Sequence, residues 1–159
     1  MRTSGMAAVA LAAAALVLMA GGCGQAPAAN SGSNSAGCGG SRHSVEVVVG
    51  LNGGRSVSRC VGFSAKTITA ETALRRSGIE FSSEHFSFGD EVCQLDHEPR
   101  AYTSCTGTDY WALFVWRDGH WRSASVGISD LSLSPGEALG WRYDPTKGLD
   151  PGPTQTPPR

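Results

Sequence analysis

The chain has 159 residues, a length that allows one folded domain rather than two. Its formal net charge is −1 and it carries no basic stripe, so the composition argues against nucleic-acid binding. It also lacks the acidic block that would indicate a solvating tail.

The first predicted feature is an apolar leader. Arg2 precedes an unbroken apolar run over 7–20, which is too short to span a bilayer comfortably and is typical of a secretory signal peptide. The run ends in Ala20-Gly21-Gly22-Cys23, which resembles the lipobox of bacterial lipoproteins. We therefore predict a cleaved signal peptide over 1–22 and lipid on Cys23, which would anchor the protein to the outer face of the bacterial cell membrane.

An ordinary secreted protein is the alternative to a lipoprotein. The third residue before the lipobox Cys is usually Leu, and here it is Ala20. Cleavage could then fall later, for instance after Ala26-Pro27-Ala28. Either form of the protein would be exported.

Low-complexity segments flank the predicted domain. Residues 23–44 are rich in Gly, Ala, Ser and Asn, a composition that buries too little apolar surface to fold, and they are predicted to form a flexible tether. Residues 145–159 hold five of the eight prolines and are predicted to be a disordered tail. The folded domain is therefore expected over 45–144.

A β-hairpin is predicted at the start of this domain. The β-branched run over 44–49 leads to Asn52-Gly53-Gly54, which suits the positive φ angles of a tight turn. Residues 56–61 then alternate polar and apolar side chains, as a return strand does.

A short helix is expected next, over 70–77. Thr69 has the character of an N-cap, Glu71 lies in the first turn, and Gly78 stops the helix. Two turns are too short to be stable alone, so one face must pack on the sheet. That face holds Ala70, Ala73 and Leu74.

Later strands are predicted near 90–95, over 110–116 and over 138–143. The segment 110–116 is apolar on both faces, which indicates a central strand. The following Asp118-Gly119 turn begins a hairpin that pairs Trp116 with Trp121 at a non-hydrogen-bonded position, so the two indoles should touch.

Five cysteines in a small exported chain indicate disulfides. Setting Cys23 aside leaves an even number. Cys93 and Cys105 flank a polar loop and are predicted to pair. Cys60 pairs most simply with Cys38, although the strand register would place Cys60 opposite Val45 or Val47, so residues 38–44 would have to fold back.

We find no catalytic motif, and we expect a domain that is not an enzyme and needs no cofactor. The polar cluster Asp96-His97-Glu98 is the nearest to a reactive site. Consecutive extended residues point to opposite sides, so at most two of these side chains could converge, whereas a metal site needs three or four ligands. The expectation is a solvated loop with a salt-bridged His, and neither catalytic nor metal-binding residues.

Aromatic residues are the better candidates for binding a ligand. Core packing is the default role for large rings, but a strand that is apolar on both faces cannot place every ring in one core. Exposed aromatic surface is therefore expected, and such surface marks ligand or partner sites. The candidates are Tyr110, Trp116 and Trp121, with Asp96 and His97 as polar contacts.

The order of several motifs resembles a family of bacterial exported domains that are similar to the C-terminal β-grasp domain of transcobalamin and intrinsic factor. The resemblance covers roughly residues 45–144. It rests on Thr72-Ala73-Leu74, the segment 89–96, Cys105, Tyr110-Trp111, Trp121 and the segment 133–143. It implies an α+β, β-grasp-like fold, in which one short helix packs on a small mixed sheet built from hairpins and stapled by disulfides.

The sequence thus favours a monomeric, membrane-anchored domain that binds a ligand. One hypothesis is a cell-surface lipoprotein that binds a small, corrinoid-like molecule as an accessory to uptake. The alternative is a non-enzymatic module that holds a protein or glycan of the cell envelope, because the chain lacks the helical barrel that closes over the corrinoid in transcobalamin.

Overall fold

The computed structural model describes residues 38–105, 107, 109–144, 153 and 157. The predicted signal peptide over 1–22, the lipidated Cys23, the tether before Cys38 and most of the predicted tail over 145–159 lie outside these residues. Within the described ranges, no helix combines the length and the hydropathy needed to cross a membrane.

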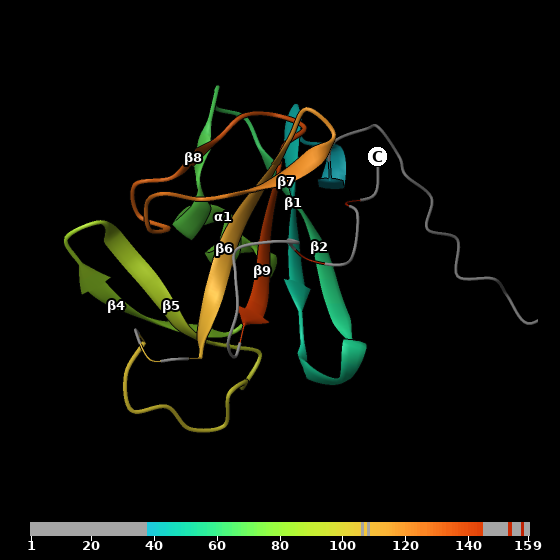
Figure 1. Ribbon diagram of the computed structural model, residues 1–159. Helices are drawn as coiled ribbons and strands as arrows, with labels where there is room; N and C mark the ends of the chain where they lie inside the picture. Colours follow the sequence, from blue (N-terminus) through green and yellow to red (C-terminus); the bar gives the residue numbers. More distant parts are fainter. Residues whose placement is uncertain (1–37, 106, 108, 145–152, 154–156, 158–159) are drawn as a thin grey trace, which may run out of the picture. The chain divides into compact units, whose positions relative to one another are not determined.

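A five-stranded mixed sheet carries the fold (Figure 1). Its spatial order is β2-β1-β9-β6-β7, and every neighbouring pair is antiparallel except β1 and β9, which run parallel. Two hairpins, β1–β2 and β6–β7, therefore flank the last strand. The strands are β1 (His43–Gly50), β2 (Ser56–Phe63), β6 (Tyr110–Arg117), β7 (His120–Ser123) and β9 (Ala138–Asp144).

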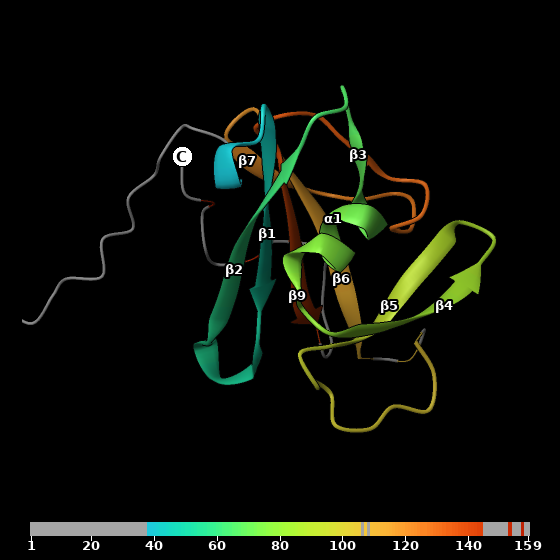
Figure 2. The same ribbon diagram turned by 180° about the vertical axis from the view of Figure 1, so that it is seen from behind.

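One helix, α1 (Ala70–Ser77), lies against this sheet (Figure 2). Thr69 caps it, because its Oγ1 accepts a hydrogen bond from the backbone N of Thr72 at 3.2 Å, and Gly78 ends it in the left-handed conformation at φ 72°. The predicted boundaries and caps are confirmed. The face predicted to pack on the sheet is fully buried: Ala70, Ala73 and Leu74.

The hydrophobic core lies between α1 and the sheet. Alternate residues of β1 point toward the helix, as do Leu139 and Trp141 of β9 and Trp111 and Val115 of β6. Trp141 is 1% exposed in the middle strand of the sheet. The β1 contribution consists of Val45, Val47 and Val49.

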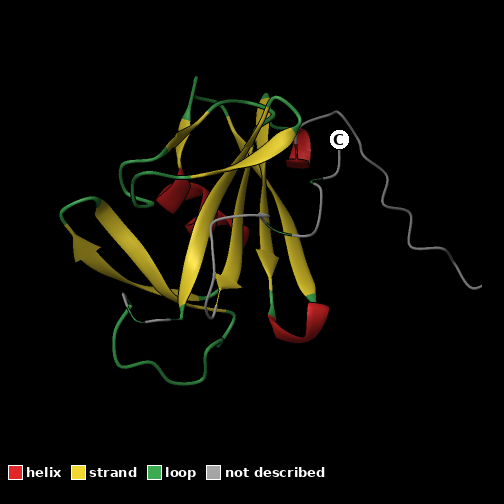
Figure 3. Ribbon diagram, viewed as in Figure 1, coloured by secondary structure: helices red, strands yellow, loops and turns green. Residues whose placement is uncertain are grey.

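Two small sheets complete the described fold. β4 (Phe81–Phe86) and β5 (Gly89–Leu95) form an antiparallel ribbon beside the larger sheet (Figure 3), and β3 (Ile68–Thr69) pairs with β8 (Ser132–Leu133). β5 was predicted from the sequence, whereas β4 was not. Most of β4 is exposed or half-buried, so it shows none of the polar and apolar alternation that marks a strand packed on a core.

Both predicted disulfides are present, Cys38–Cys60 and Cys93–Cys105. The predicted register at Cys60 was wrong by one residue, because Cys60 faces Glu46. The loop between β1 and β2 spans 51–55, so the strand pairing starts with Gly50 opposite Ser56. Counted from that pair, Cys60 lies opposite Glu46 instead of a neighbouring valine. The segment before β1 folds back over β2, as expected, and a Cβ on Gly62 would lie 2.6 Å from the Cys38 carbonyl oxygen.

Within the described residues, these features define a small α+β domain with one α-helix on a mixed sheet, two short 3-10 helices at Cys38–Gly40 and Asn52–Gly54, and two disulfides. Five antiparallel strand pairs and one parallel pair are present among the described strands, so the small mixed sheet built from hairpins that the sequence predicted is present. The predicted contact between Trp116 and Trp121 is also present, with ring centroids 5.3 Å apart in an edge-to-face arrangement.

Candidate functional site

A cleft of about 160 Å³ lies between β5, β6 and the segment that follows β7. Its lining is mainly apolar and aromatic, and the acidic residues Asp90 and Glu91 lie on its β5 side. Phe88, in the β4–β5 turn, also lines the cleft and is 42% exposed. The lining of the cleft also includes Asp90, Glu91, Tyr110, Trp111, Gly127 and Trp141.

Backbone hydrogen bonds hold the far wall of the cleft against β5. The N–H of Gly127 donates to the Phe88 carbonyl at 2.6 Å, and the N–H of Ile128 donates to the Asp90 carbonyl at 2.8 Å. In return, the Asp90 N–H donates to Ser129 Oγ at 3.0 Å. The segment after β7 therefore joins the β4–β5 ribbon to the main sheet and fixes the width of the cleft.

Gly127 permits this close approach, and Gly127→Ala is expected to lower the free energy of unfolding by about 1–3 kcal/mol. An added Cβ would lie 2.5 Å from the Asp90 carbonyl oxygen and 2.6 Å from the Asp90 N, so the segment must move away from β5. Urea denaturation measures the loss. Gly107→Ala is the control, because its Cβ would have no neighbour closer than 3.8 Å, and an equal loss in the two variants would contradict the prediction.

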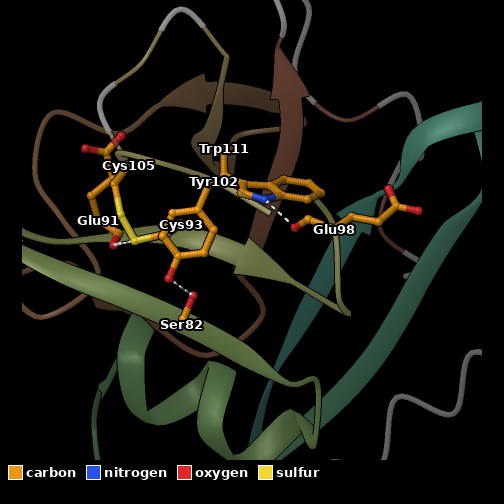
Figure 4. The surroundings of a disulfide bond; sticks show 7 residues. All are labelled: Ser82, Glu91, Cys93, Glu98, Tyr102, Cys105 and Trp111. Carbon is orange, nitrogen blue, oxygen red and sulfur yellow. Dashed lines mark hydrogen bonds between the residues drawn. A yellow bond between two sulfur atoms is a disulfide. The ribbon is translucent and has the colours of Figure 1, made fainter. Parts of the chain in front are cut away.

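Two carboxylates face each other across the β4–β5 ribbon, Glu84 and Glu91. Glu91 is half-buried, and this burial raises the pKa of its carboxyl, while the negative charge of Glu84 raises it further. Figure 4 shows Glu91 beside the Cys93–Cys105 disulfide. A cation bound beside Glu91 would favour the ionised carboxylate and so oppose both causes of the raised pKa.

Glu84→Gln is expected to lower the pKa of Glu91, because one of the two causes of the rise is removed. A carboxyl whose pKa is raised on folding contributes stability below its unfolded pKa of about 4.3 and loses it as the pH rises through the folded value. Glu91→Gln should therefore raise the melting temperature at neutral pH. NMR titration of the Glu91 carboxyl carbon measures the shift, and an unchanged titration in Glu84→Gln would refute it. Glu80→Gln, which removes a charge at the other end of the ribbon, is the control.

Asp96 and His97 form a tight turn at the end of β5, with φ of 48° and 63°. His97 Nε2 lies 3.3 Å from a carboxylate oxygen of Glu80. The Glu98 carboxylate accepts hydrogen bonds from the backbone N of Asn52 at 2.9 Å and from Arg55 at 2.6 Å. The side chains of His97 and Glu98 thus contact different partners, and the contact of the His with a carboxylate that was expected there is present.

The five ligand candidates from the sequence lie in three separate places. Tyr110 lines the cleft. Trp116 and Trp121 lie at the opposite end of β6, about 20 Å away along a strand of this length, and Asp96 and His97 form their own turn. The structure therefore does not bring the predicted aromatic and polar contacts together.

The large apolar side chains that are most exposed among the described residues are Phe88 at 42% and Tyr102 at 39%. Neither residue was among the ligand candidates predicted from the sequence. Phe88 belongs to the turn of an unpredicted ribbon, and Tyr102 lies in the loop closed by Cys93–Cys105, where its hydroxyl is 2.9 Å from Ser82 Oγ (Figure 4). Both residues lie outside strands, so no alternation of polar and apolar residues indicates which side of the chain is exposed there.

The described residues bring three atoms of metal-ligand type together at Glu84, Cys93 and Cys105, within 4.8 Å of one another. The two sulfur atoms are joined to each other in the disulfide. Metal coordination by sulfur needs free thiolates, so this group offers a metal only the Glu84 carboxylate in the oxidised protein.

Comparisons with known proteins agree with this class of fold. No family model matches the chain, and no curated protein does. Among solved structures, the chain is similar to a protein from Ruminococcus gnavus ATCC 29149 that is described as a "putative metal binding protein". The TM-score is 0.50 at 13% identity, over 64% of this chain and 96% of the other. A similarity at this identity concerns the fold alone.

Proposed function

We propose that this domain is a non-enzymatic binding module that takes a small, positively charged ligand into the cleft between β5 and β6. The observation that carries the proposal is half-buried Glu91 at a cleft that is also lined by the exposed Phe88 and the half-buried Tyr110. Aromatic faces attract cations, and a desolvated carboxylate adds a charge-assisted contact. Asp90 also lines the cleft, and its carboxylate contacts His85 Nδ1 at 2.6 Å, so Glu91 is the carboxylate on which the proposal depends.

The size of the cleft limits the ligand. Pockets for drug-sized molecules measure about 300–1,000 Å³, whereas this cleft measures about 160 Å³. A small ammonium group fits such a volume. A corrinoid, which the family resemblance implies, could place only one of its side groups there, and a partner would have to cover the rest.

The cellular setting and the finer fold class belong to the same proposal. We place the domain outside the cell, held to the membrane by lipid at Cys23 or secreted, and two disulfides support an oxidising compartment. A transcobalamin-like β-grasp is supported by the helix that follows the first hairpin and by the parallel pairing of β9 with β1. Fold resemblance alone does not transfer the ligand.

The test is an NMR titration of the purified protein with tetramethylammonium chloride. Saturable shifts of the Trp111 indole and of Phe88 are expected. Glu91→Gln should weaken binding about tenfold, which corresponds to about 1.4 kcal/mol, and Glu80→Gln should not. Absence of saturable shifts at millimolar probe, with the protein folded, would overturn the proposal.

Three further titrations separate the alternatives. Saturable binding of cobinamide would favour the corrinoid function. Binding of calcium chloride, lost in Glu84→Gln and in Glu91→Gln, would favour a divalent cation between the two facing carboxylates. Co-sedimentation with cell envelopes in the absence of any small-ligand binding would favour the protein or glycan module.

A further inference from the structure

The sheet has a second apolar face, on the side away from α1. The side chains that alternate with the core residues of β1, β6 and β9 point to this outer face. Several of them are almost fully buried, although the helix lies on the other side. Their exposed fractions are 0% for Val48, 3% for Ala112, 1% for Phe114 and 1% for Ala138.

Gly140 creates a depression in the middle of this outer face. Its register partners are Val48 on β1 and Phe114 on β6, so a residue without a side chain is flanked by two apolar ones. A Cβ on Gly140 would lie 2.6 Å from Cζ3 of Trp121. The indole of Trp121 therefore extends from β7 over β9 and forms a wall of the depression.

A proline from the C-terminal segment occupies the same depression. Cγ of Pro153 would lie 2.7 Å from that Gly140 Cβ, beside the Trp121 ring atoms. Pro153 is buried, and so is Pro157. Twelve residues of chain lie between Gly140 and Pro153. The burial of Pro153 shows that this residue of the segment predicted to be a disordered tail packs on other residues.

Proline and indole are well matched for such a contact. Proline-rich segments dock in aromatic-lined grooves because their backbone is already restricted and loses little entropy on binding. The segment 150–159 contains four prolines, at 151, 153, 157 and 158. The half-buried pair Trp116–Trp121 supplies the aromatic surface.

We propose that the outer face at Gly140 and Trp121 is a docking site for the proline-rich C-terminal segment of this same chain, with Pro153 as its anchor. The Trp116–Trp121 pair then forms the aromatic surface on which this proline-rich segment docks, and this surface is separate from the cleft on β5. This inference rests on contacts that the cleft does not share, so it stands or fails independently of the proposed ligand.

The test is NMR spectroscopy of the full chain. Nuclear Overhauser effects are expected between the ring protons of Pro153 and the indole of Trp121. Pro153→Ser should shift the Trp121 indole signal and leave the signal of Trp111 in place. Pro27→Ser, the same substitution in the other low-complexity segment, should shift neither.

A mixed sample of labelled and unlabelled protein tests which molecule supplies the proline. Contacts within one molecule support the proposal. Contacts seen only between molecules, together with a dimer mass in light scattering, would overturn it in favour of exchange of the segment between two copies. Absence of any Pro153–Trp121 contact, with Trp121 unchanged in Pro153→Ser, would also overturn it.

Discussion

Replacement of Trp141 by alanine is expected to lower the free energy of unfolding by about 3–5 kcal/mol. Trp141 is 1% exposed and lies on β9, the middle strand, where it faces Val49 on one side and Leu113 on the other. Removal of the indole would leave a cavity that the two neighbouring strands cannot fill. Native proteins have a free energy of unfolding of about 5–15 kcal/mol, so the variant would retain only a small part of its stability.

Trp121→Ala is the matched control, because it removes the same atoms from a half-buried position at the edge strand. Chemical denaturation followed by circular dichroism gives both free energies on one scale. A loss in Trp121→Ala as large as that in Trp141→Ala would contradict the assignment of Trp141 to the centre of the core. Binding of the tetramethylammonium probe in the cleft supplies a second readout, because Trp141 lines the cleft and Trp121 does not.

Local signals explain which parts of the fold could be predicted from the sequence. The cap at Thr69, the apolar face with Leu74 and the stop at Gly78 lie within ten consecutive residues, so α1 needs no distant information. The contact between Trp116 and Trp121 follows from the length of a two-residue turn. Where the loop was longer, between β1 and β2, the register at Cys60 shifted by one residue.

The candidate site could not be predicted, because it depends on pairings between distant segments. Glu91 has a raised pKa partly because β4 places Glu84 opposite it, and β4 has no strand pattern of its own. The wall around Gly127 is held to the β4–β5 ribbon by backbone hydrogen bonds. Such bonds place no requirement on side chains except at Gly127, where a Cβ would not fit, so the sequence carries little signal for them. Of the five predicted ligand candidates, Tyr110 is the one that lines the cleft.

The same dependence on distant contacts applies to the loop between Cys93 and Cys105. This loop carries Glu98, whose carboxylate binds Asn52 and Arg55 and whose carbonyl accepts a hydrogen bond from the Trp111 indole at 3.1 Å (Figure 4). The disulfide therefore confines a loop that joins the first hairpin to the start of β6. Loss of the disulfide would therefore loosen the contacts of Glu98 both with the first hairpin and with Trp111.

The double variant Cys93→Ala/Cys105→Ala is expected to lose about 4 kcal/mol of stability. The chain-entropy model gives about 3 kcal/mol for a sequence separation of 12, and truncation of two buried sulfur atoms adds to the loss. Cys38→Ala/Cys60→Ala is the control. Its separation of 22 predicts a slightly larger entropic loss, but Cys38 is half-buried and Cys60 exposed, so about 3 kcal/mol is expected in total.

Urea denaturation of the two double variants and of the oxidised protein measures the difference. If loop closure alone determined the effect, the Cys38–Cys60 variant would be the less stable of the two. A larger loss in the Cys93–Cys105 variant, accompanied by a shift of the Trp111 indole signal, would show that burial and the Glu98 contacts outweigh loop length. The cleft would then depend on a covalent bond that the cleft residues themselves do not make.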